Sequence, residues 1–269
     1  MGFTPWQMAT QDISEDRLLR PNRFHERFPD VRMSYVIAST VRTGSHLLSE
    51  ALCNTEVAGR PVEAFCRRHS AVYREEWRIP PDAGFSRYYH SVVRHGTTKN
   101  GVFGVKIHRS HVPLLAEDSG LAGSPDEIVS GLFPGAKFIY VTRKDRRAQA
   151  ISLYRARATN EWWRIEGVPN PFARGPEPVF DPHSILEAEK YIEDENAAWE
   201  CFFRAEGIEP LRIEYESVDH NLRKNVAHIL CFLGEDPEQA QAVRFPRFVR
   251  QRDAITDQWL WQMDNLFPR

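Results

Sequence analysis

Two short segments of the chain combine glycine, hydroxyl and arginine residues as phosphate-binding loops do. The first, Thr40-Val-Arg-Thr-Gly-Ser-His46, follows the apolar run 34–39. Its glycine allows a tight turn, the next helix offers N–H groups without a partner inside the helix, and Arg42 adds charge. The predicted phosphate contacts are Thr40, Arg42, Thr43, Gly44, Ser45 and His46. The segment lacks the Gly-Lys-Ser/Thr of a Walker loop, so alone it is also compatible with an ordinary strand-to-helix turn.

The second segment, Tyr140-Val-Thr-Arg-Lys-Asp145, ends the strongest strand pattern of the chain, 136–142. Arg143 stands at the carboxyl end of this strand, where ligands of open α/β sheets gather, and Ser152 lies about two turns into the next helix. An arginine and a hydroxyl so placed suit a terminal phosphate monoester. Alone, the pattern is also that of a solvated basic helix start. Two such sites together indicate a ligand with phosphates at two places.

The elements that must position these residues alternate along the chain. Apolar, β-rich runs predict strands at 34–39, 101–108, 136–142 and 210–215. Periodic runs predict helices at 46–52, 86–95, 126–132, 145–158, 183–204, 218–233 and 256–266. This alternation predicts an α/β fold in which a central, mainly parallel sheet is flanked by helices.

The same patterns predict a simple domain organisation. Residues 1–33 are polar and irregular, which indicates an N-terminal extension, and 34–269 reads as a single domain. Within that domain, residues 160–181 hold four prolines and two adjacent tryptophans, which favours a loop or lid over a linker.

Composition limits the classes of partner. The formal net charge of −2 gives no general attraction for nucleic acid or anionic membranes. There is no basic and apolar leader, and no apolar run approaches the roughly 18–20 residues of a membrane span. We therefore expect a cytoplasmic protein with no nucleic-acid partner and no membrane span.

The four cysteines point to no metal. Cys53, Cys66, Cys201 and Cys231 form no Cys-x-x-Cys pair and show no zinc-ligand spacing beside histidines. The prediction is four buried apolar side chains in a reducing compartment, and no bound metal.

With both phosphate segments in view, the chain resembles the sulfotransferases, and from Tyr35 to Trp259 it looks like the mycobacterial-type trehalose 2-sulfotransferase family. Four segments carry the resemblance: Val41–Leu48, Ala58–Phe65, Gly101–Lys106 and Arg143–Ser152. A late Arg250-Gln251 is similar to that family's C-terminal cofactor loop. The resemblance implies a P-loop-like sulfotransferase fold and the donor 3′-phosphoadenosine 5′-phosphosulfate (PAPS), with adenosine 3′,5′-bisphosphate as product. It also implies a homodimer and transfer without a metal.

The resemblance assigns catalytic roles as well. Arg42 would stabilise the leaving 5′-phosphate, and Glu63, in the loop after the first helix, would be the general base. Independently of the resemblance, Lys106 is another cation at a strand end and is expected to assist. However, Val105-Lys-Ile-His108 also resembles the Lys-x-His of cytosolic sulfotransferases, in which the histidine is the base. Both Glu63 and His108 remain candidates, and Glu63 is favoured.

The resemblance also implies an acceptor that contains a sugar, and sugar sites combine aromatic faces with polar groups. The predicted acceptor contacts are Phe65, Arg67, Trp162 and Trp163. After Phe65 the sequence Cys66-Arg-Arg-His69 departs from the trehalose enzymes, so another disaccharide, a glycolipid or a glycosylated natural product is also possible.

Two rival functions remain. One is a P-loop-type nucleotide kinase, which the missing Gly-Lys-Ser/Thr and the lack of an obvious magnesium aspartate disfavour. The other is a non-catalytic nucleotide-binding regulatory module, which the joint presence of Arg42, Glu63 and Lys106 disfavours.

Overall fold

The computed structural model describes residues 30–165, 167, 175–176, 178–244, 248 and 251–268. Within them, four parallel strands form one sheet in the order β2-β1-β3-β4. The strands are β1 (Met33–Ser39), β2 (Val102–His108), β3 (Lys137–Thr142) and β4 (Leu211–Glu214). β2 is buried at every position, as expected for a parallel strand that is covered on both faces. The predicted α/β class is confirmed.

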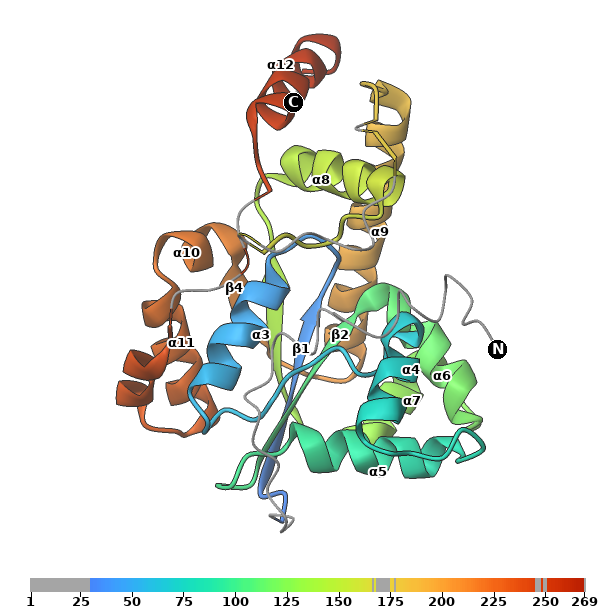
Figure 1. Ribbon diagram of the computed structural model, residues 1–269, viewed down its shortest axis with the longest axis vertical. Helices are drawn as coiled ribbons and strands as arrows, with labels where there is room; N and C mark the ends of the chain where they lie inside the picture. The colour runs from blue at the N-terminus through green and yellow to red at the C-terminus, as the bar shows by residue number, and fades with distance from the viewer. Residues whose placement is uncertain are drawn as a thin grey trace.

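Helices cover both faces of the sheet and its carboxyl edge (Figure 1). One face packs on α3 (Ser45–Asn54), α10 (Tyr215–His220) and α11 (Leu222–Leu233). The other packs on α4 (Arg67–Glu76), α5 (Phe85–Gly96), α6 (Val112–Ser119) and α7 (Pro125–Leu132), with the C-terminal half of α9 (Pro182–Ala205).

A third apolar cluster joins the remaining helices. α8 (Arg146–Thr159) packs against α9 and α12 (Ala254–Leu266) beyond the carboxyl ends of the strands (Figure 1). Two short 3-10 segments, η1 (Arg109–His111) and η2 (Pro237–Ala242), complete the described elements. The third cluster therefore covers the strand ends that the two phosphate segments follow.

The predicted helix 218–233 is two helices. Asn221 has extended backbone angles (φ −149°, ψ 72°), and its side chain accepts a hydrogen bond of 3.2 Å from the Lys224 N–H. Asparagine is a preferred N-cap because its side chain replaces the bond that the first helical turn lacks. A new helix therefore begins after Asn221, and it ends at Gly234 (φ 80°) as predicted.

Three other predictions need correction or lie partly outside the described residues. Helices α4 and α6 were missed, and in α4 the reason is that Tyr73 is its one buried residue, so no apolar stripe marks it.

Cys53 and Cys66 are buried, but Cys201 and Cys231 are exposed, so the expectation of four buried cysteines is wrong. Residues 1–29 and much of the predicted lid lie outside the described residues. No helix in the described part of the chain is long and apolar enough to cross a membrane.

Candidate active site

A cavity of about 1270 Å³ opens at the carboxyl edge of the sheet. Its walls come from the loop after β1, the ends of β2 and β3, α8, residues 159–164 and the α10–α11 turn. Val243, Arg244, Phe248, Gln251 and Arg252 also line it. Single-ligand pockets usually enclose about 300–1,000 Å³. The cavity is therefore large enough for two ligands side by side.

The loop after β1 has an unusual backbone. Gly44, the residue before α3, has φ 71°, and a Cβ there would lie 2.4 Å from the Tyr215 ring. Only glycine fits this turn. Arg42 also has a positive φ of 65°, which costs a non-glycine residue on the order of 1 kcal/mol. Gly44, the N-cap, has no side chain that could cap α3. Gly44, Ser45 and His46 line the cavity, so the first turn of α3 borders it, as the phosphate-loop hypothesis requires.

Two of the predicted phosphate contacts turn inward. Thr43 Oγ1 donates a 3.0 Å hydrogen bond to the Thr40 carbonyl. Gln149 Nε2 donates to Thr40 Oγ1 at 3.0 Å and to the Val41 carbonyl at 2.7 Å. Thr40 and Thr43 are buried and are not among the described residues that line the cavity. They hold the shape of the loop, whereas Ser45 and His46 line the cavity.

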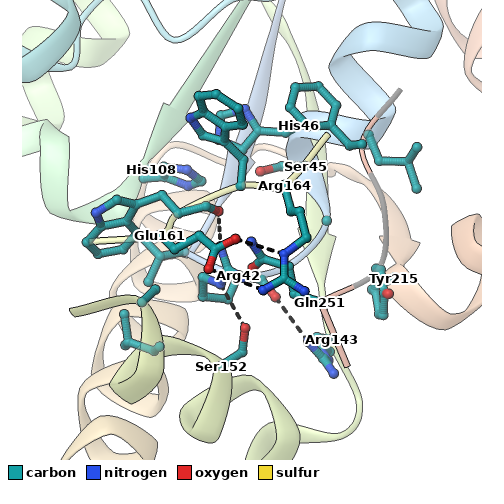
Figure 2. Close-up of a pocket in the computed structure, with 18 of the residues that line it drawn as sticks. Arg42, Ser45, His46, His108, Arg143, Ser152, Glu161, Arg164, Tyr215 and Gln251 are labelled. Carbon is teal, nitrogen blue, oxygen red and sulfur yellow. Dashed lines mark hydrogen bonds and ion pairs between the residues drawn. The ribbon is translucent and has the colours of Figure 1, made fainter. Parts of the chain in front are cut away.

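The structure joins the two phosphate segments that the sequence separates. Arg42 Nε donates to Ser152 Oγ at 2.8 Å, and the other nitrogens of its guanidinium bond to the Trp162 carbonyl and to Gln251 Oε1 (Figure 2). Arg143 donates to the Arg42 carbonyl at 3.4 Å. We call Arg42, Arg143, Ser152 and Gln251 the arginine cluster. Arg250, also predicted to bind the cofactor, lies outside the described residues.

Arg143 is a partly buried charge of the arginine cluster. Burial lowers its pKa, while Tyr215, Asp145 and Glu216 raise it, and the net pKa is below the ordinary value. Its guanidinium carbon lies 4.8 Å from the centre of the Tyr215 ring, and its Nε is buried without an acceptor among the described residues. A buried donor without an acceptor costs about 1–3 kcal/mol, so this position favours an anion.

A second charged group lies beside β2. Loop residue Val62 pairs with Val105 of β2, and the Lys106 N–H donates to the Val62 carbonyl at 3.1 Å. This pairing brings Glu63 next to Lys106, whose Nζ lies 2.8 Å from Glu63 Oε2. Both side chains are buried, and that of Lys106 is 0% exposed, so this ion pair has little solvent screening.

Three histidines complete the surroundings of Glu63. His46 Nε2 lies 3.4 Å from Oε2, which also faces Lys106. His111 Nδ1 and His108 Nε2 lie 3.3 and 3.5 Å from Oε1. Burial alone would raise the pKa of Glu63, but Lys106 and the three histidines outweigh it and hold that pKa well below its usual range. Glu63 is therefore ionised at neutral pH.

His108 carries no charge at neutral pH. Burial, together with nearby Lys106, lowers its pKa well below 6.5 despite the opposing effect of Glu63. Its Nδ1 lies 2.9 Å from Ser39 Oγ and its Nε2 faces Glu63. Both ring nitrogens therefore already face protein groups, whereas Glu63 Oε1 has no contact shorter than 3.3 Å among its described ion-pair partners.

The predicted acceptor residues divide between the cavity and other sites. Trp162 and Trp163 line the cavity, and Arg68 lies 5.1 Å over the Trp162 ring. Phe65 packs in the core, and Arg67 pairs on the surface with Asp118, so neither is among the described lining residues. The reason is that α4 begins at Arg67. Arg67 faces solvent, whereas the next two residues of the helix, Arg68 and His69, line the cavity.

Among the described residues that line the cavity, Cys66, His111 and Tyr215 were given no site role from the sequence. Tyr215 had a usable signal, because it follows a strand that lies beside β3. Cys66 also had one, because the Cys-x-x-His spacing places it in a single helical turn with His69, so the prediction that no cysteine has ligand spacing beside a histidine is wrong.

One family model and two sequence relatives match most of this chain. The Stf0 sulphotransferase family model matches residues 34–264. A trehalose 2-sulfotransferase of Mycobacterium tuberculosis (strain ATCC 35801 / TMC 107 / Erdman) is 31% identical over 255 residues, which is 84% of this chain and 92% of that protein. A trehalose 2-sulfotransferase of Mycolicibacterium smegmatis (strain ATCC 700084 / mc(2)155) is 27% identical over 256 residues, with the same coverage.

One solved structure is also similar. The sulfotransferase domain of the Synechococcus PCC 7002 olefin synthase aligns with 89% of this chain and 86% of its own, with a TM-score of 0.36 and 15% identity. That similarity is too low to add to the assignment, which rests on the family model and the two sequence relatives.

Proposed function

The chain belongs to the Stf0 sulphotransferase family, and we propose that it moves the sulfuryl group of PAPS to a hydroxyl of a carbohydrate such as trehalose, or of a glycosylated metabolite. The observation that carries the proposal is the meeting of the arginine cluster and the ion-paired Glu63 in one cavity. The first suits a nucleotide with two phosphate positions, and the second suits proton removal from an acceptor.

In this proposal the arginine cluster and the loop 40–46 hold the donor. Arg143, with its buried Nε, and Ser152 bind the 3′-phosphate. The N-terminus of α3, with Ser45 and His46, binds the 5′-phosphosulfate. Arg42 reaches Ser152 from the α3 loop and so lies between these two positions.

The transfer is an in-line displacement. The acceptor oxygen forms a bond to sulfur while the bond from sulfur to the 5′-phosphate oxygen breaks, and its electron pair leaves with the phosphate. Arg42 and Lys106 stabilise the charge that develops on the leaving group. The acceptor proton moves to Glu63 Oε1, because Oε2 is already engaged by Lys106.

Glu63 is the better candidate for the general base. It is ionised at neutral pH, whereas His108 has both ring nitrogens directed at Ser39 and Glu63. We expect Glu63→Gln to lower kcat roughly 100-fold or more, the usual size of a general-base effect. His108→Asn should have a smaller effect. If His108→Asn has the 100-fold effect and Glu63→Gln does not, His108 is the base.

The acceptor side is proposed to be the half of the cavity that Trp162, Trp163 and Arg68 line. Aromatic faces beside a cation suit a sugar ring. The enzyme is further proposed to act in the cytoplasm as a homodimer. Gel filtration should therefore give about twice the 31.2 kDa mass of the chain, and a monomer peak would contradict the dimer.

Isothermal titration with adenosine 3′,5′-bisphosphate, compared with AMP and with ATP without magnesium, tests the donor site. We expect the 3′-phosphate to raise affinity at least tenfold, and Arg143→Ala to remove that gain, since a bond to a charged group contributes about 1.5–3 kcal/mol. Arg146→Ala is the matched control, because Arg146 starts α8 but is not among the described residues that line the cavity.

Equal affinity for AMP and adenosine 3′,5′-bisphosphate would overturn the donor assignment. Binding of ATP that requires magnesium would instead favour the kinase. Mass spectrometry of trehalose and other disaccharides incubated with PAPS and the enzyme then tests turnover, and absence of any sulfated product with tight donor binding would favour the regulatory module.

A further inference from the structure

We propose that Glu63, Cys66 and His69 form a Zn²⁺ site in the cavity, and that zinc bound there inhibits the enzyme. This zinc is not a cofactor of the transfer. The binding site rests on geometry alone, whereas its inhibitory effect rests on the function proposed above.

The first observation is the closeness of three different ligand types. A carboxylate oxygen of Glu63, Sγ of Cys66 and a ring nitrogen of His69 all lie within 4.8 Å of one another. Zinc bonds of about 2.0–2.3 Å place tetrahedral ligands about 3.5 Å apart. Closing the site therefore needs side-chain movements of roughly 1 Å, which rotamer adjustment can supply.

The local backbone explains why Cys66 and His69 meet. Cys66 is the N-cap of α4, and the His69 N–H donates to its carbonyl at 2.9 Å. An N-cap side chain lies beside the third helical residue, which here is His69. The pair is thus preformed by the first turn of a helix, and a thiol with an imidazole is a donor set that zinc prefers over magnesium or calcium.

His111, on η1, lies next to this group. Its Nδ1 lies 3.3 Å from Glu63 Oε1. His111 therefore borders the three ligand atoms, which lie within 4.8 Å of one another before any metal enters.

A second group of possible ligands, His46, Glu63 and His108, is less suitable. Lys106 Nζ lies 2.8 Å from the ring nitrogens of His46 and 2.8 Å from Glu63 Oε2. A buried ammonium group in that position repels a dication. The Oε1 side of Glu63, which faces His111, is where a metal can bind without displacing the ammonium.

The site also has an entry path and a consequence. Glu63, Cys66, His69 and His111 all line the cavity, so an ion can reach them from it. Zinc on Glu63 Oε1 would occupy the lone pair that receives the acceptor proton. Inhibition should therefore compete with the acceptor and leave the affinity for adenosine 3′,5′-bisphosphate unchanged.

Cobalt titration of the full-length protein tests binding without any need for turnover. We expect one equivalent of Co²⁺ to give the near-ultraviolet charge-transfer band of a thiolate ligand, and Zn²⁺ to abolish it. Cys66→Ser should lose the band, and His69→Gln should weaken Zn²⁺ affinity at least tenfold. Cys231→Ser is the control and should bind as the parent does, because Cys231 is exposed and is not among the described cavity residues.

Activity then tests the inhibitory role. Zn²⁺ should inhibit the parent, EDTA should reverse the inhibition, and whatever turnover Cys66→Ser retains should be insensitive to zinc. A Co²⁺ spectrum without a thiolate band, or equal Zn²⁺ affinity in Cys66→Ser and the parent, would overturn the site. Zinc that binds through Cys66 without inhibiting would overturn the inhibitory role. Binding through Cys66 in a protein without sulfotransferase turnover would keep the site and reject the proposed function.

Discussion

The buried Lys106–Glu63 pair gives the sharpest stability prediction. Both side chains are buried and the two charged atoms lie 2.8 Å apart. Removing one partner of such a pair leaves an uncompensated buried charge and costs about 3–5 kcal/mol. For Lys106→Met we expect the lower end, about 3 kcal/mol, because His111, whose pKa is raised above its ordinary value, still faces Glu63. At about 2–4 °C per kcal/mol, Tm should fall by roughly 6–12 °C.

Calorimetric unfolding at neutral pH measures this fall against a matched surface pair. Lys190 lies 2.6 Å from Asp194, but their side chains are 70% and 62% exposed, so Lys190→Met should cost no more than about 1 kcal/mol. The double variant Lys106→Met/Glu63→Gln should recover most of the loss, since removing both charges leaves neither uncompensated. A Lys106→Met protein no less stable than Lys190→Met would refute the reasoning.

Two further predictions concern the loop before α3 and the contact between α8 and α12. Gly44→Ala places a Cβ 2.4 Å from the Tyr215 ring at a residue with positive φ. Its affinity for adenosine 3′,5′-bisphosphate should therefore fall at least tenfold, as measured by isothermal titration. The control is Gly207→Ala, which should bind normally, because Gly207 also has positive φ but no described atom lies within 4 Å of the added Cβ. The Arg155 guanidinium holds the pKa of the Asp253 carboxyl well below its usual range, so this pair stabilises the fold above about pH 4 and is lost as pH falls. Asp253→Asn keeps a helix cap, so it removes the ion pair alone. At pH 7 the variant should be less stable than the parent by about 1 kcal/mol or less, because the pair is partly exposed. This difference should shrink toward pH 3 in thermal unfolding, and a difference that stays constant with pH would contradict the assignment.

The sequence was sufficient for the sheet and for the residues at its carboxyl edge. Buried parallel strands leave near-continuous apolar runs, and such strands place their carboxyl ends on one edge whatever their order. Arg42 and Arg143 could therefore be assigned to one cavity before the fold was known. The direct bond between Arg42 and Ser152 could not be predicted from the sequence. This contact depends on β1 lying beside β3 and on the positive φ of Arg42.

The Glu63 environment lay beyond sequence reasoning for a different reason. Loops have no periodicity, so nothing in the pattern showed that Val62 pairs with Val105 and carries Glu63 to Lys106. The same holds for α4, whose mostly polar sequence hid the helical turn that joins Cys66 to His69. Contacts made through irregular or polar segments are set by tertiary packing, which short-range patterns do not encode.

Arg42 links the two halves of the cavity, and this link bears on how the substrates cooperate. Its guanidinium bonds to Ser152 on α8 and to Gln251 near the C-terminus (Figure 2), and to the carbonyl of Trp162 in the proposed acceptor half. A donor phosphate that draws Arg42 toward itself competes with these acceptors, and the Trp162 carbonyl is one of them. Binding of the donor is therefore expected to alter the segment that lines the acceptor half, and by linkage the acceptor must change donor affinity by the same factor. Titration of adenosine 3′,5′-bisphosphate with and without a saturating disaccharide measures that factor directly, and a factor of one would show that Arg42 holds its contacts in both states.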